Sequence, residues 1–241
     1  MFIGANLVRK IMPLAVATVS SLGLAGCFDL SQKVALHRDG SGSYAIAISA
    51  DGIVGEGLGR KHADIDIDDE IDAKGVTTVT HKGDVTTQTK TVAFRDLSDL
   101  HLGDETLSLH VIGQDGGATK VAFHRSFRID HDMRDRDDER GFARDVVHSI
   151  FGDHQYTFAL WLPGRIDRIA PVKLGNRAIT PVVWGDASGH TIIWKMPLSD
   201  MLLDGSIDFD VDFAANGQFH DTQTLPGKHH HNRHHDDDDV D

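Results

Sequence analysis

Apolar and polar residues alternate with a period of two over much of the chain, which is the pattern of half-buried β-strands. The alternation begins at residues 31–37, stops at a glycine-containing turn over residues 38–42, and resumes at residues 43–49. Two alternating segments around such a turn predict a β-hairpin.

Further strands are expected over residues 76–81, 86–94, 107–112, 118–127, 156–162, 182–184, 191–196 and 207–213. The first two are rich in threonine and valine, whose β-branched side chains fit a pleated surface. A short apolar helix or turn is expected at residues 142–151. The sequence therefore predicts a mainly β (α+β) fold, either an antiparallel sheet sandwich or a barrel-like domain with few short helices.

Two acidic segments interrupt this pattern. Residues 58–71 contain an alternating DIDIDDEID run, which fits an edge strand or the start of a helix. Residues 130–140 are almost wholly charged and cannot enter a hydrophobic core.

The N-terminal segment has the features of a signal peptide. Arg9 and Lys10 form a positive region, and an uncharged stretch of about 14 residues follows at 11–24. A spanning helix needs roughly 20 apolar residues, so this stretch is too short for a permanent transmembrane segment. We therefore expect residues 1–26 to be removed on export.

The leader ends in Leu24-Ala25-Gly26-Cys27, which resembles the lipobox of bacterial lipoprotein precursors. The resemblance implies cleavage before Cys27, a diacylglycerol on its thiol and acylation of the new amino terminus. Two or more acyl chains anchor a protein stably in a membrane. The alternative is an ordinary secretory signal in which the cysteine occurs by chance.

The bulk composition narrows the function classes. The formal net charge is −13, so the chain offers no basic stripe for nucleic acid and no net positive charge for docking on anionic lipids. Cys27 is the single cysteine, which excludes an internal disulfide framework. Membrane association is therefore expected to depend on the lipid at Cys27.

Three further segments carry a resemblance to a family. The hairpin sequence KVALHRDGSGSYAIAIS resembles the opening of the LppM-like lipoprotein domain. The later segments YTFALWLPGRIDRI and TIIWKMPL resemble the closing hairpin of that domain. The resemblance covers roughly residues 27–213, and it implies an extracytoplasmic, β-rich, membrane-tethered domain without catalytic residues.

The C-terminal tail concentrates potential metal ligands, because imidazole is a good ligand for zinc, nickel and copper. The histidines of the tail are His229, His230, His231, His234 and His235, and four aspartates follow at residues 236–239. The alternative is a disordered solubilising terminus with incidental metal affinity. An added purification tag is a further alternative, although the interrupted pattern argues against it.

Other candidate sites favour structural interpretations. The acidic run at 64–70 lacks the glycine and the ligand spacing of a calcium loop, and His131 between two aspartates fits an exposed loop. No G-x-S-x-G or phosphate-loop motif is present. Ser41, Ser188 and Ser206 are expected in turns. The tryptophans, expected to be core anchors, are Trp161, Trp184 and Trp194.

These observations predict three regions: a signal peptide at 1–26, a lipid-anchored domain at 27–219 and a disordered tail at 220–241. The expected function is that of a non-enzymatic envelope lipoprotein binding a lipid-like ligand or an envelope partner. The alternative is a lipoprotein that binds zinc or a similar metal through its tail. The body is expected outside the cytoplasm, on the cell membrane or the outer membrane, and Phe28 after the cysteine favours the outer membrane.

Overall fold

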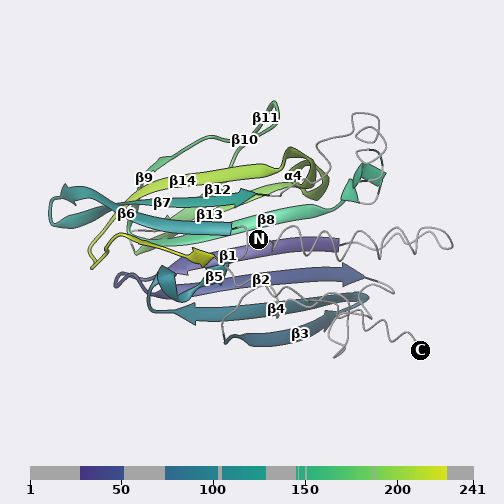
Figure 1. Cartoon of the computed structure of the whole chain (residues 1–241), viewed down its shortest axis with the longest axis horizontal. Helices are drawn as coiled ribbons and strands as arrows, with labels where there is room; N and C mark the ends of the chain where they lie inside the picture. The colour runs from purple at the N-terminus through teal and green to yellow at the C-terminus, as the bar shows by residue number, and fades with distance from the viewer. Residues whose placement is uncertain are drawn as a thin grey trace, which may run out of the picture.

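The computed structural model describes residues 28–51, 74–102, 105–128, 145, 147–149, 151–186 and 188–226. These residues form two large β-sheets that lie one over the other (Figure 1). The leader, Cys27, both acidic segments and the histidines of the tail lie outside the described residues.

The larger sheet has seven strands. In spatial order they are β12 (Val182–Asp186), β13 (Gly189–Pro197), β8 (Gln155–Pro163), β1 (Phe28–Leu36), β2 (Gly42–Asp51), β4 (Val85–Phe94) and β3 (Val76–Lys82). Neighbouring strands are antiparallel except β1 and β8, which run parallel. β12 and β3 form the two edges of this sheet.

The second sheet has five antiparallel strands. In spatial order they are β15 (Thr222–Gln223), β6 (Glu105–Asp115), β7 (Ala118–Arg128), β14 (Ser206–Ala215) and β9 (Arg165–Ile169). The smaller elements are β5 (His101–Leu102) paired with β16 (Leu225–Pro226), β10 (Val172–Leu174) paired with β11 (Arg177–Ile179), the 3₁₀ helix η2 (Leu97–Asp99) and the helix α4 (Leu198–Asp204).

The period-two pattern explains how the sheets pack. Every second residue of β1, β2, β8 and β14 is buried, and nearly all of the apolar ones among them belong to one hydrophobic core. Aromatic rings join the sheets: the Phe209 ring of β14 lies 4.8 Å from that of Phe158 and 5.1 Å from that of Trp194. The two sheets are therefore the layers of a sandwich.

The prediction of a mainly β fold with few short helices is confirmed, and the sandwich is the architecture observed. The strand β9, the helix α4 and the short strands β5, β10, β11, β15 and β16 were not predicted. The start of the segment 220–241, which was expected to be a disordered tail, forms β15 and β16, because its backbone pairs with β6 and β5. Val147 and Phe151, in the segment expected to be a short helix or turn, join the core. Among the described residues, no helix combines the length and the apolar character needed to cross a membrane.

Candidate functional site

The first described residue is already part of the sheet. Phe28 starts β1, and its backbone N–H donates to Nδ1 of His154 at 2.8 Å. Its ring lies edge-on against the rings of Phe151 and His154, with centroids 6.4 Å apart in both pairs. The carboxylate of Asp29 accepts the N–H of Gln155 at 2.9 Å. Cys27, the expected lipid site, is thus followed directly by an anchored strand.

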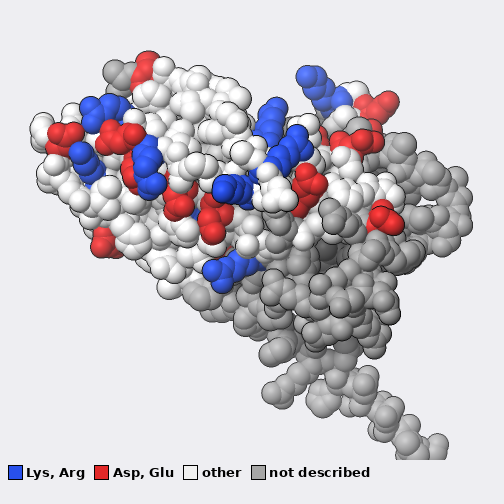
Figure 2. Space-filling view, turned by 90° about the horizontal axis from the view of Figure 1, so that it is seen from above, with Lys and Arg blue, Asp and Glu red and all other residues white. Residues whose placement is uncertain are grey.

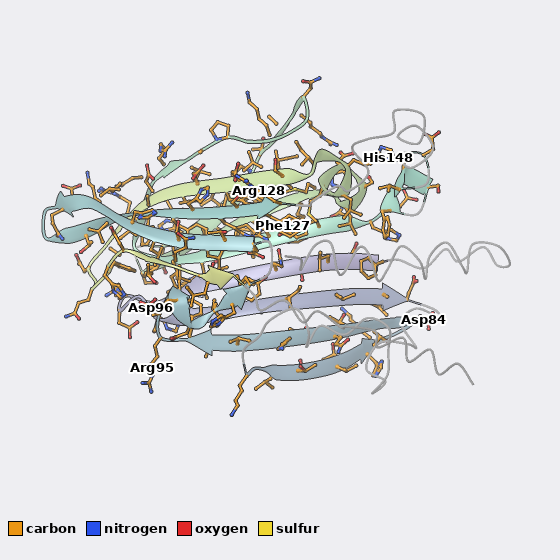
Figure 3. All side chains as sticks on the ribbon, in the orientation of Figure 1. Asp84, Arg95, Asp96, Phe127, Arg128 and His148 are labelled. Carbon is orange, nitrogen blue, oxygen red and sulfur yellow. The ribbon has the colours of Figure 1, made fainter. Side chains whose placement is uncertain are left out.

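Strand register places this junction at one end of the sandwich. Phe28 pairs with Ala50, and the next residue of β2 pairs with Val85 beside the β3–β4 turn. Figure 3 shows Asp84 of that turn at the same end as His148, and Arg95 and Asp96 at the opposite end. A lipid on Cys27 would therefore enter at the end marked by Asp84.

The surface of the seven-stranded sheet that faces away from the five-stranded sheet is here called the outer face. Its residues are those that alternate with the buried positions, and in the central strands most of them are small and uncharged. They are Ser31, Ala35, Ser43, Ala45, Ala47, Ser49, Thr87, Thr89, Thr91, Ala93, Thr157 and Ala159.

One corner of the outer face is apolar. Val182 and Trp184 of the edge strand β12 are 58% and 52% exposed, and they pair with Ile193 and Thr191 of β13. Thr191 pairs in turn with Trp161 of β8. Val182, Trp184, Ile193 and Trp161 are here called the tryptophan patch.

A glycine lets the Trp161 indole lie close to the sheet. A Cβ atom on Gly189 would meet Cζ2 of Trp161 at 2.7 Å and Cε2 at 3.0 Å. An aromatic ring that covers a glycine on a neighbouring strand is a known way to stabilise a sheet. The indole therefore lies against the sheet and forms part of the outer face.

Few charges lie on the outer face. Among the described residues they are three lysines and three aspartates: Lys33, Lys82, Lys195, Asp29, Asp51 and Asp186. Asp186 accepts hydrogen bonds from the hydroxyl and the N–H of Ser188 in the β12–β13 turn, which lower the pKa of its carboxyl. The face is thus neutral in a chain of net charge −13.

The outward surface of the five-stranded sheet is different, because it carries charges in pairs. Arg168 of β9 donates to Asp212 of β14 at 2.6 Å, and His124 of β7 lies 2.7 Å from Asp210. Figure 2 shows cationic and anionic side chains interspersed along the edge of the molecule that is uppermost in Figure 1. Such exposed pairs are ordinary solvated surface.

A polar network lies between the two sheets. Nε of Arg125 (β7) donates to Glu105 (β6) at 2.5 Å, and both side chains are fully buried. Gln32 of β1 accepts from Arg125 and donates to Glu105 at 3.0 Å. The Tyr44 hydroxyl donates to Glu105 at 3.0 Å, and that of Tyr156 donates to Gln32. The network therefore ties the sheets together.

Aromatic rings enclose the cation of this network. Cζ of Arg125 lies 4.1 Å from the ring centroid of Phe158 and 5.2 Å from that of Phe209. Burial opposes the charged form of Arg125, but the neighbouring Glu105 carboxylate raises the pKa of the guanidinium. Burial also raises the pKa of both Tyr44 and Tyr156 above the ordinary value. Because these groups are sealed from solvent, their arrangement is structural.

A second polar cluster closes the opposite end. Asp96 caps η2 through Ser98 and accepts hydrogen bonds from Thr222 and His220. Partial burial opposes ionisation, but the bonds from Thr222, Ser98 and His220 lower the pKa of Asp96. The cluster fastens the segment after β14 to η2, which is a structural role.

The structure tests only some of the residues singled out in the sequence. Leu24, Ala25, Gly26, Cys27 and the five tail histidines lie outside the described residues, as do residues 64–70 and 130–132. Ser41 and Ser188 lie in turns as predicted, each bonded to a nearby aspartate, whereas Ser206 begins β14. In the described part of the chain, no group of three or more His, Cys, Asp or Glu residues is placed to hold a metal.

The prediction for the tryptophans is correct for one residue and wrong for another. Trp194 is fully buried and packs on Phe158 and Phe209. Trp184 is half exposed, because it points to the outer face, away from the five-stranded sheet, and its edge strand β12 has a neighbour on one side only. Trp161 is partly buried on the outer face. The signal for this face was the run of Ala, Ser and Thr at alternate positions.

Comparison with known proteins finds one distant structural match. No protein-family model matches the chain, and no curated protein matches it. The chain is similar to the NMR structure of the folded domain of the Mycobacterium tuberculosis LppM protein, with 10% identity and a TM-score of 0.39. The match covers 81% of this chain and 94% of that chain. At this identity and TM-score it assigns neither a fold family nor a function.

Proposed function

We propose that the protein is a non-enzymatic lipoprotein of the bacterial cell envelope, anchored through Cys27. Its β-sandwich stands outside the cytoplasm, on the cell membrane or the outer membrane. The sandwich binds a lipid-like molecule or an envelope partner through the outer face of the seven-stranded sheet.

The observation that carries the proposal is the junction at Phe28. A lipobox-like sequence ends at Cys27, and the next residue is held in β1 by the hydrogen bond from its N–H to the His154 imidazole and by aromatic packing. A lipid on Cys27 would therefore hold the sheet itself at the membrane, without a flexible linker between them. This arrangement suits a protein that works at the membrane surface.

Packing between the sheets favours binding at the surface. The largest fully buried side chains include Trp194, Arg125, Tyr44, Phe158 and Phe209, which occupy the space between the sheets. A lipid entering there would have to displace the Arg125–Glu105 pair and the aromatic rings around it. Exposed apolar side chains on the outer face offer contacts without that cost.

The roles of the polar clusters support a non-enzymatic function. Arg125 and Glu105 are sealed in the core, and Asp96 is occupied in capping η2 and holding Thr222. Each cluster has a structural task that accounts for its residues. The proposal therefore assigns the protein a binding role at the membrane.

The anchor is tested by comparing the full wild-type chain with Cys27→Ala in a bacterial host. Membrane fractionation and the intact mass of the mature N-terminus are measured. We expect the wild type in the membrane with an acylated Cys27, and the variant released into the soluble fraction. A free thiol in the wild type, with equal partitioning of both chains, would refute the proposal.

A further inference from the structure

We infer that the outer face of the seven-stranded sheet lies flat on the bilayer that holds the N-terminal lipid, with the tryptophan patch inserted at the membrane–water interface. This inference rests on the lipid anchor of the proposed function, and it identifies the partner of the outer face as the membrane surface.

The first argument is the chemistry of the tryptophan patch. Indole side chains gather at the level of lipid headgroups, because the ring is apolar and its N–H can bond to water or headgroups. Trp184 and Val182 are exposed by half or more on an edge strand, and Ile193 and Trp161 continue the patch inward. Single exposed apolar side chains are common on soluble proteins, whereas four of them together on one face indicate a contact surface.

The second argument is the width of the face. Exposed valines also occur at its other edge, where Val76 of β3 is 66% exposed and Val85 of β4 is 38% exposed. Strands lie about 4.8 Å apart, so β12 and β3 are separated by about 29 Å. The outer-face side chains of the central strands are mostly Ala, Ser and Thr, which project only a short distance from the sheet. A partner strand that pairs with β12 would contact one edge only. A membrane surface would contact the apolar residues at both edges.

The third argument is charge. The face is neutral while the chain as a whole is strongly acidic, so this is a surface on which approach to phosphate headgroups is not opposed. Lys195 follows Ile193 by two residues on the same side of β13, and Lys33 lies one strand beyond Ala159. Both are exposed, and neither pairs with a described carboxylate. Lysine stems can lie along an apolar surface while their ammonium groups reach phosphates.

The fourth argument is where the chain enters the sheet. β1 is the central strand of the outer face and begins directly after Cys27. At about 3.3 Å per residue, Ala35 lies about 23 Å from Phe28 along the strand, and it pairs with Trp161. A sheet lying flat brings the patch to the same bilayer as the anchor. Because the tether keeps the local concentration high, even weak interfacial contacts suffice.

The test uses the mature lipidated chain, purified in detergent and reconstituted into phosphatidylcholine vesicles whose acyl chains carry bromine near the headgroup. Bromine quenches tryptophan emission only at short range, so the depth of the exposed indoles is measured directly. We expect strong quenching in the wild type, a reduced signal in Trp184→Phe, where only Trp161 remains in the tryptophan patch, and no quenching when Trp161→Phe is added. Trp194, sealed in the core, provides the unquenched reference.

A matched pair of variants tests the orientation. Val182→Asp should reduce the quenching, because it places a charge beside Trp184 on the outer face. Ile112→Asp is the control: Ile112 is 56% exposed, close to the 58% of Val182, but lies on β6 of the other sheet. We expect the tryptophan emission of this control to be quenched as strongly as that of the wild type.

Each outcome separates the two proposals. An acylated chain whose emission is unquenched overturns the flat orientation and leaves the anchor intact. Protection of Trp184 from the bromine by self-association or by a bound protein, measured on the same vesicles by cross-linking, also overturns it. A chain that lacks the acyl mass overturns the anchor, and the flat orientation with it.

Discussion

The interior of the sandwich and the outer face of the larger sheet reverse the usual distribution of side chains. Inside, Arg125 and Glu105 are fully buried as an ion pair. Outside, Trp184 and Val182 stand half exposed to solvent. Charged residues are rarely buried without a partner, whereas single exposed apolar residues are common. The unusual features here are the burial of the pair and the grouping of the apolar residues.

The two regions differ in what folding requires of them. The buried pair is stabilised by Gln32, two tyrosines and aromatic rings, so the removal of one partner would leave a charge without compensation. Substitutions on the outer face leave no charge uncompensated in the core. Its apolar side chains are therefore available for a function, and the four predictions below separate the two regions by stability.

The largest effect is expected from Glu105→Gln. The substitution keeps the shape of the side chain but leaves the Arg125 cation in the core without its counter-charge. Removing one partner of a buried ion pair typically costs about 3–5 kcal/mol. The free energy of unfolding, measured by urea denaturation at neutral pH, should fall by about that amount.

The matched control removes both charges. Glu105→Gln combined with Arg125→Met should recover much of the lost free energy of unfolding, because no unpaired charge remains. A single substitution that costs less than about 1 kcal/mol would contradict the view that charge balance holds this region together.

A second effect is expected at alkaline pH. Tyr44 and Tyr156 are the two tyrosines of the chain, and burial raises the pKa of both in the folded state. Below about pH 10 both states keep the phenol protons; above it the unfolded state loses them first, so stability falls as pH rises. Tyrosinate absorbance should appear together with unfolding, which circular dichroism detects. Gradual ionisation near pH 10 with the fold intact would contradict this prediction.

The sequence predicted the fold well because one signal governs it. Alternation of apolar and polar residues located the hairpin of β1 and β2 and the main strands of both sheets. The parallel pairing of β1 with β8 was not predictable from local pattern, since the two strands are more than a hundred residues apart. Helix α4 was missed because seven residues are too few for a clear helical period.

The candidate site was less predictable. Exposure of Trp184 depends on which side of β12 faces the other sheet and on β12 being an edge strand, and neither is a property of the residues 182–186 themselves. Likewise, Glu105, Arg125 and Gln32 come from three strands, and only the packing of the sheets brings them together. The alternation does place Gln32 and Arg125 in the buried phase of their strands, between apolar residues, but it does not show which partners they meet there.

An intermediate effect is expected from Gly189→Ala. The new Cβ would lie 2.7 Å from Cζ2 of Trp161 and 3.0 Å from the carbonyl oxygen of Leu162, so the indole has to move. Overpacking of this kind costs about 1–3 kcal/mol. Thermal unfolding should register the loss, and the tryptophan emission should shift. If Trp161→Phe in the same chain restores none of the stability, the clash is with the backbone and not with the indole.

The smallest effect on stability is expected on the outer face itself. Trp184→Ala should change the free energy of unfolding by less than about 1 kcal/mol, because half of the side chain is already in water. The same substitution at the fully buried Trp194 should cost about 3–5 kcal/mol. Urea denaturation of the two variants side by side compares the same residue type on the outer face and in the core. If Trp184→Ala were as costly as Trp194→Ala, the tryptophan patch would be part of what holds the fold together. Its exposure would then be no argument for a membrane contact, whereas a small cost would leave interfacial binding as the reason for an exposed tryptophan at this edge.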